Sequence, residues 1–204
     1  IDVAADEGAT AAQARKNPAL WLLIVMAGFF VIAAGMMQQF SSYASTGALG
    51  AAVGAMGVTV CMIGQLFGKF GLGWLCDHTG ARVSGVVASI FGAAGIAIVL
   101  FSVDNAMMFY VGVFLFGIGF AALNIVPPMA CRQAFGQKDY ANIFSMVATG
   151  LNVFSGFSAL IYAQIFDITG SFAGCFYLII GFYVVTLICS LVIVPMGRRS
   201  WAKK

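Results

Sequence analysis

Charged residues are scarce in this chain. Of its 204 residues, 8% are Asp, Glu, Lys or Arg and 62% are hydrophobic, whereas about a quarter of an average soluble domain is charged. A water-facing surface needs far more polar side chains, so a soluble globular fold is excluded. The 25 glycines, 10 methionines and 19 phenylalanines suit helices packed together in lipid, where small residues let backbones approach. The composition therefore predicts an integral membrane protein.

The residues that build catalytic and metal sites are also few. The only histidine is His78, and the five cysteines lack paired spacing, so we expect small buried hydrophobes and no metal site or cofactor. The segment 156–159 faintly resembles a serine-nucleophile turn, but Ser158 lies within an apolar stretch and His78 in a polar loop, so an enzyme is not expected. The net charge of +3 is scattered along the chain, and we expect no nucleic-acid partner.

Six apolar stretches follow one another along the chain, each close to the roughly 20 residues that a helix needs to span a bilayer. They are predicted as transmembrane helices at 19–40, 49–72, 83–103, 106–126, 143–166 and 172–195. Polar, glycine- or proline-containing segments separate them. Pro127 and Pro128 each remove a backbone donor, so we expect the fourth helix to end there or to continue with a kink.

The basic residues fall on one side of this topology. With six spans, both termini and the second and fourth loops share a side, and every Lys and Arg lies there: Arg15, Lys16, Lys69, Arg82, Arg132, Lys138, Arg198, Arg199, Lys203 and Lys204. The opposite loops hold only the charges of Asp104 and Asp167. Basic loops stay on the cytoplasmic side. Both termini are therefore predicted to be cytoplasmic, in a cell membrane such as the inner membrane of a bacterium.

A short sequence recurs in the two halves of the chain. Asp-x-Thr-Gly occurs at 77–80 after the second predicted helix and at 167–170 after the fifth, 90 residues later. Such a sequence also recurs by chance, because Asp and Thr cap helices and Gly ends them. The equivalent placement favours two triplets, 19–103 and 106–195, of which the second is inverted. The fold class predicted is an all-α membrane protein with a three-plus-three inverted repeat.

The loop after the second helix resembles the signature loop of the major facilitator superfamily, which reads Gly, three residues, Asp, a basic residue, one residue, Gly and then basic residues. Four positions match it: Gly73, Asp77, Gly80 and Arg82. His78 and Ala81 stand where the family has basic residues, and such departures are typical of the second-half copy of the motif. The resemblance implies one half of a twelve-helix transporter, helices seven to twelve.

Each matched position has a physical role to test. Gly73 is expected to let a neighbouring helix come close, and Gly80 to turn the chain at positive φ. Asp77 is placed to cap the third helix or to face another helix's positive end, and Arg82 to pair with Asp77 or with lipid phosphate. The resemblance implies that this loop is a cytoplasmic latch that joins the two halves in the outward-open state. The simpler alternative is a capped turn with a basic residue.

The resemblance also implies what the chain works with. The expected function is secondary active transport of a small solute by alternating access, as a symporter or an antiporter. The expected partner, besides the lipid bilayer, is an N-terminal six-helix half. Residues 1–18 are then part of the central cytoplasmic loop, and 196–204 form a basic cytoplasmic tail. The stretch 163–172 is similar to the outer turn of the monocarboxylate and oxalate/formate branches.

In that family the first, second, fourth and fifth helices of a half face the central cavity, and the third and sixth face lipid. Polar side chains in the first group are costly in hydrocarbon, so they are expected to point into the bundle or the cavity. The candidates for solute contact are Asn152, Gln38, Gln39, Tyr43, Gln65, Asn124 and Ser155. A hydrogen bond between helices is the alternative role for each.

Charge is missing where an anion carrier is expected to have it. No Lys, Arg, Asp or Glu lies in the middle of a predicted span, although the oxalate and monocarboxylate branches are expected to hold their anion with a cation there. An organic anion remains a possible solute, with its cation supplied by the other half. A six-helix channel or a structural membrane protein is the main alternative function, but neither a charged filter nor a re-entrant segment is evident.

Overall fold

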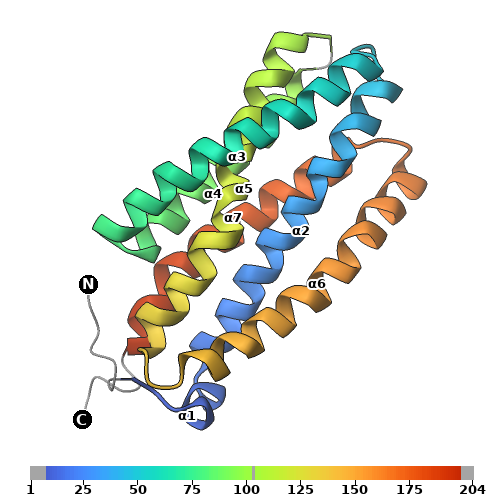
Figure 1. Ribbon diagram of the computed structural model, residues 1–204. Helices are drawn as coiled ribbons and strands as arrows, with labels where there is room; N and C mark the ends of the chain where they lie inside the picture. The colour runs from blue at the N-terminus through green and yellow to red at the C-terminus, as the bar shows by residue number, and fades with distance from the viewer. Residues whose placement is uncertain (1–7, 103, 199–204) are drawn as a thin grey trace.

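The structure is a computed structural model that describes residues 8–102 and 104–198. Within that part the chain forms a bundle of helices joined by short connections (Figure 1). Their bounds are α1 Ala11–Lys16, α2 Pro18–Thr46, α3 Ala51–Thr79, α4 Ala81–Phe101, α5 Ala106–Phe135, α6 Tyr140–Thr169 and α7 Ala173–Arg198. The helices α2 to α7 are long and apolar enough to cross a membrane. They correspond to the six predicted spans; Val103, Arg199, Lys203 and Lys204 lie outside the described residues.

Five of the six helices are longer than the predicted apolar stretches, and α5 shows why. It continues unbroken through Pro127 and Pro128 to Phe135, so an end at the prolines is wrong. Proline removes an intrahelical donor, but membrane helices tolerate it where neighbouring helices surround the backbone. Pro127 is buried and Pro128 half-buried. Likewise α2 passes its predicted end at residue 40 and stops at Thr46.

The short helix α1 was not predicted. Thr10 accepts a hydrogen bond from the Gln13 N–H, and the Gln13 side chain accepts one from the Thr10 N–H, which closes a capping box. The segment before α1 is docked on the end of α5: the Ala9 N–H donates to the Phe135 carbonyl (2.7 Å).

The loop between α5 and α6 also holds α1 through a carboxylate. The Ala11 N–H donates to Oδ2 of Asp139 (2.7 Å) and the Asn142 amide donates to Oδ1 (2.6 Å). These hydrogen bonds, the backbone one first, hold the pKa of Asp139 below its usual range. Residues 9–11 and the start of α6 are therefore tied together at one end of the bundle.

The helices pack as two interlocked triplets, α2–α4 and α5–α7. The middle helix of each triplet packs chiefly on the first helix of the other: α3 on α5 and α6 on α2. Of the third helices, α4 packs chiefly on α5, whereas α7 packs most extensively on α4 and next on α2. This exchange is the pattern of an inverted repeat. It leaves α3 and α6 the least buried spans, at opposite edges of the view in Figure 1.

Glycine allows the close contact between α3 and α5. A side chain at Gly64 would overlap the backbone of Phe114, and one at Gly68 would overlap that of Ile118. From the other helix, Gly117 approaches the Cys61 carbonyl in the same way. Since lipid offers little hydrophobic driving force between helices, the van der Waals packing that such close contact allows helps to hold them together.

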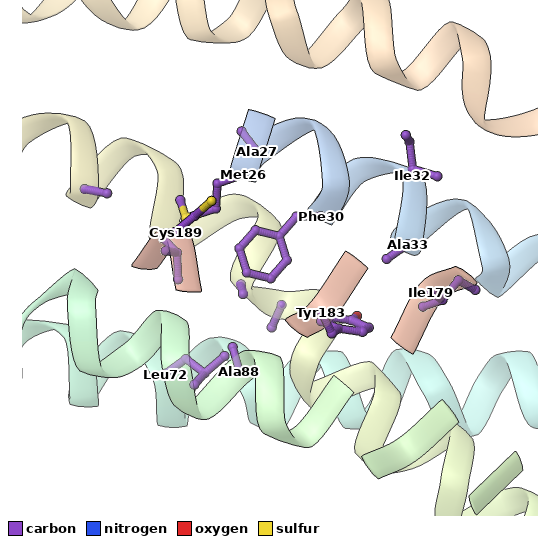
Figure 2. Close-up of a cluster of buried hydrophobic side chains, with 14 of the residues drawn as sticks. Met26, Ala27, Phe30, Ile32, Ala33, Leu72, Ala88, Ile179, Tyr183 and Cys189 are labelled. Carbon is purple, nitrogen blue, oxygen red and sulfur yellow. The ribbon is translucent and has the colours of Figure 1, made fainter. Parts of the chain in front are cut away.

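The apolar core lies where α2, α4, α5 and α7 meet, and Figure 2 shows its central side chains. Phe30 of α2 packs edge-on against Tyr183 of α7, with ring centroids 6.2 Å apart. Phe116 of α5 meets the same tyrosine at 6.4 Å. Polar groups of α4 and α7 point inward here: the hydroxyls of Ser89 and Thr186 are 3.0 Å apart. These buried hydroxyls of α4 and α7 are thus paired with each other. The outer faces of the two helices carry apolar side chains, such as Phe91 and Val184.

Candidate functional site

A polar cavity of about 250 Å³ lies between α2, α5 and α6. Its polar lining is Gln38 and Gln39 from α2 and Ser155, Ser158 and Tyr162 from α6. Phe120 and Leu123 of α5 supply an apolar wall. The cavity therefore offers two amides and three hydroxyls beside an apolar surface, which is the usual make-up of a small-molecule site.

The α6 side of the cavity is fixed by two hydrogen bonds to α2. The Tyr162 hydroxyl donates to the Ile32 carbonyl (2.6 Å), and the Ser158 hydroxyl donates to the same oxygen (3.4 Å). Gly35 faces Ser158 so closely that a Cβ there would overlap its hydroxyl. The Ile32 carbonyl thus holds α6 at a defined rotation, and that rotation turns Ser155 toward the cavity.

The remaining polar groups of the cavity are available to a ligand. Gln38, Gln39 and Ser155 have no side-chain hydrogen-bond partner within residues 8–102 and 104–198. Each glutamine amide carries two donors and an acceptor oxygen. A solute with hydroxyl, amide or carboxylate groups could be bound by these three side chains through hydrogen bonds.

Three of the predicted contact residues are therefore brought together, and four are not. Tyr43 points the other way: its hydroxyl lies 3.4 Å from the Val99 carbonyl, and its ring packs against Phe176 of α7. Gln65 lies half-buried on α3, and Asn152 is exposed on α6 outside the cavity lining. Asn124 lines a second cavity nearer the other end of α5.

Sequence reasoning missed Tyr162 as a cavity residue and placed no weight on Gly35 or Ser158. The available signal was the spacing on α6: Ser155, Ser158 and Tyr162 recur at intervals of three and four and so share one helix face. Gly35 carried no signal, because its role depends on which residue of α6 lies opposite it.

The loop motif is a turn of one residue between α3 and α4. Gly80 has φ 92° and ends α3 with its N–H bonded to the Cys76 carbonyl (2.9 Å), so the positive φ expected of it is confirmed. Asp77 does not cap α4, however. The cap comes from Gln133 of α5, whose side-chain oxygen accepts from the Ala81 N–H (3.0 Å). Gln133 is buried and reaches this N-terminus from across the helix interface.

The other motif residues face outward. Asp77 and Arg82 are exposed and form no ion pair with each other in the described structure. A Cβ at Gly73 would meet no atom within 4 Å, so the close helix that this glycine was expected to admit is not part of the described chain. The turn is built by Gly80 and Gln133, and Asp77 and Arg82 stay free for contacts outside this bundle.

Comparisons with known proteins bear on this fold. The chain is 27% identical over 151 residues to the uncharacterized MFS-type transporter YhjX of Escherichia coli (strain K12), covering 71% of this chain and 36% of that protein. A crystal structure of an auto inhibited POT family peptide transporter is similar with a TM-score of 0.69 at 20% identity, covering 90% of this chain and 38% of that one. The fold is that of half a major facilitator transporter. No protein-family model matches the chain.

Both matched proteins are transporters by name, and the chain spans little more than a third of each. The fold does not support an enzyme, and neither do the contacts of His78 and Ser158. Nδ1 of His78 contacts the Trp74 carbonyl (2.8 Å) at the end of α3, while Ser158 is held within α6 by Ile32. Among residues 8–102 and 104–198, no group of His, Cys, Asp and Glu could hold a metal ion.

The repeated Asp-x-Thr-Gly sequence ends the middle helix of each triplet, and its threonines make the same local hydrogen bond. The Thr79 hydroxyl donates to the Leu75 carbonyl (2.7 Å), and the Thr169 hydroxyl to the Ile165 carbonyl (2.6 Å). Gly80 and Gly170 both have positive φ and end their helices. The two copies are therefore equivalent helix ends of the two triplets. This also shows that a cap-and-turn role accounts for the Thr and Gly positions.

Proposed function

We propose that this chain is the C-terminal half of a secondary transporter that carries a small polar organic solute by alternating access. The observation that carries the proposal is the cavity of α2, α5 and α6, which collects unpaired amides and a hydroxyl within a bundle of apolar helices. Rocking of one six-helix half against the other then exposes the cavity to each side of the membrane in turn.

The partner half is proposed to cover α3 and α6. These two spans are the least buried, and α3 carries large apolar side chains on its outward face, such as Phe67 and Phe70. The cavity lies beside α6, so a second half seated on these faces would close it from the open side. Asp77 and Arg82 would meet that half at the loop end.

Both termini are proposed to be cytoplasmic. The described basic residues gather at the end of the bundle where α2 begins and α7 ends, and Arg198 donates to the Gln133 carbonyl there (3.1 Å). Asp104 and Asp167 lie at the opposite end. Basic loops are retained in the cytoplasm during membrane insertion.

An organic anion is the solute class that we favour. A second cavity, of about 570 Å³, lies at the inner end of α5 and includes Asn124, Arg132 and Tyr140. Arg132 places a half-buried cation on the side of α5 where a solute would leave toward the loop end. It supplies one positive charge to an anion in transit, although no cation lines the cavity of Gln38 and Ser155.

The test begins with a ligand. The purified full-length protein is screened by thermal shift against small organic acids, amino acids and sugars, and each stabilising solute is then tested for uptake into proteoliposomes. Gln38→Ala and Ser155→Ala should each raise the KM of the transported solute about 3- to 10-fold, the effect of one lost hydrogen bond. Gln164→Ala removes an exposed glutamine of α6 outside the cavity and should leave KM unchanged.

A channel predicts a different result. Its flux would rise with solute concentration without saturating and would show no exchange of labelled for unlabelled solute. Saturable exchange that Gln38→Ala and Ser155→Ala weaken supports the proposal; non-saturable flux, or saturable uptake that neither variant changes, contradicts it.

A further inference from the structure

A second recess lies on the outside of the bundle. It is a groove of about 490 Å³ between the start of α2 and the first half of α6, beside the end of α1. Its walls are almost entirely apolar, with Leu20 and Ile24 on α2 and Val153 and Phe154 on α6. Gly150 forms part of the floor, where a Cβ would meet the Ile24 side chain. In Figure 1, α1 lies below the neighbouring starts of α2 and α6.

This groove and the solute cavity are on different faces of α6. Gly150 lines the groove and Ala159 lines the cavity. Nine residues separate them, which is two and a half helical turns, so the two positions point in opposite directions. The cavity faces the side proposed for the partner half. The groove therefore faces away from it, toward the hydrocarbon of the bilayer.

The mouth of the groove is basic and aromatic. Arg15 lines it, and Lys16 follows at the end of α1. Nε of Arg15 donates to the sulfur of Met146 (3.2 Å), a weak acceptor, and the guanidinium has no carboxylate partner among the described residues. Trp21 is 61% exposed, and its indole N–H lies 3.3 Å from the Arg15 carbonyl. An amphipathic ring at such a place marks the interface of the bilayer with water.

We propose that this groove binds an anionic phospholipid, with one acyl chain between α2 and α6 and the phosphate at Arg15 and Lys16. The apolar walls suit a hydrocarbon chain that enters from the bilayer, and they offer a polar solute almost no partner. Arg15 at the mouth and Lys16 next to it at the end of α1, with no acidic residue lining the groove, favour a negative headgroup over a zwitterionic one. The bound lipid would join α1 to α6 at the end of the bundle that carries the loop motif.

The test measures lipid binding by native mass spectrometry of the full-length protein, using phosphatidylglycerol and phosphatidylcholine with the same acyl chains. Wild type should retain phosphatidylglycerol in preference. The double variant Arg15→Gln, Lys16→Gln should lose about 5-fold in phosphatidylglycerol affinity for each charge removed, with phosphatidylcholine unaffected. Lys69→Gln removes an exposed cation of α3, away from the groove, and is the charge-matched control.

A second variant tests the acyl chain. Thr149→Phe places a ring in the groove from an exposed position and should weaken retention of both lipids. Gln164→Phe adds the same ring at an exposed position of α6 outside the groove and the cavity, and should behave as wild type. Equal retention of the two lipids by wild type, or phosphatidylglycerol retention that both groove variants leave unchanged, overturns the proposal. Because the readout is binding, it is independent of whether a transported solute is found.

Discussion

At the scale of single residues, Gln133 is the side chain that organises the loop end. Its side chain caps α4 at Ala81 and its carbonyl accepts from Arg198 of α7. Gly80 lies beside the same amide, 3.1 Å from its oxygen to the position of a Cβ. Here a buried amide of one helix accepts a hydrogen bond from a backbone N–H in the first turn of another helix. Such a hydrogen bond contributes more to stability than one at the surface, because no water can replace it.

Replacing Gln133 by Ala should lower the stability of the full-length protein. The α4 N-terminus loses its only side-chain cap in the described structure, which costs about 1 kcal/mol, or roughly 2–4 °C in melting temperature for a domain of this size. Thermal unfolding in detergent measures the change. Gln164→Ala, at an exposed position of α6, should melt with wild type; equal melting temperatures for wild type and Gln133→Ala would show that this cap contributes nothing.

The role of a residue was predictable from the sequence only where it depends on the residue's own backbone or on its neighbours in sequence. Gly80 ends a helix by its own backbone conformation, so its role followed from its position in the motif. The partner of the α4 N-terminus did not, because Gln133 is 52 residues away and nothing near Ala81 indicates it. Asp77 was expected to cap α4 because it lies only four residues before Ala81, but the residue that caps α4 is distant in sequence.

At the scale of helices, the contact between α3 and α5 depends on missing side chains. Gly64 and Gly68 of α3 and Gly117 of α5 each face backbone atoms of the other helix. Small residues at such intervals bring two helices to backbone contact along several turns. The same helix carries Gly71 and Gly73, where a Cβ would meet nothing within 4 Å, so only part of its glycine content serves this contact.

Gly64→Val should therefore separate α3 from α5. The added methyl groups meet the Phe114 backbone, which cannot rotate aside, and overpacking of this kind costs about 1–3 kcal/mol. Gly71→Val makes the same change seven residues along the same helix, where a Cβ would meet no atom of the described residues within 4 Å. Folded yield and melting temperature should fall for Gly64→Val alone; a similar loss in both variants would assign the effect to helix propensity or lipid contact instead.

The number of helices was predictable because each apolar stretch matches a bilayer, but their ends were not. Hydropathy falls where the lipid ends, whereas a helix continues until its backbone is capped, as α5 does to Gly136. The cavity was predicted in part for a related reason. Gln38, Gln39 and Ser155 stood out as polar residues in apolar stretches, but so did Asn152 and Tyr43. Which of them faces the cavity depends on the rotation of each helix, and hydrogen bonds such as Tyr162 to Ile32 set that rotation.

At the scale of the whole molecule, the two triplets end their middle helices in the same way but at opposite ends of the bundle. Thr79 and Thr169 make equivalent hydrogen bonds, and Gly80 and Gly170 both end their helices at positive φ, Gly170 in the αL conformation and Gly80 with an extended ψ. Asp77 and Asp167 are therefore matched positions, and both are exposed. If capping were their only purpose, the two carboxylates would be equally dispensable.

A latch between halves makes them different. Asp77 lies at the basic end, where a partner half would meet it, so Asp77→Asn should remove a charge-assisted contact and shift the outward-open population toward inward-open roughly 10-fold or more. Uptake by the full-length protein should fall while membrane insertion is unchanged. Asp167→Asn, at the opposite end, should transport as wild type.

The shift itself can be measured with Ser155→Cys as a reporter in the cavity. The five cysteines of this half are buried, so a membrane-impermeant thiol reagent reads the new cysteine once the cysteines of the other half are replaced by Ser. Adding Asp77→Asn should speed its labelling from the cytoplasmic side and slow it from the outside, because the unlatched halves part at the cytoplasmic end. Labelling rates and uptake that match those of Asp167→Asn would reduce the motif to a capped turn, since a carboxylate that holds two halves together cannot be removed without changing which side the cavity faces.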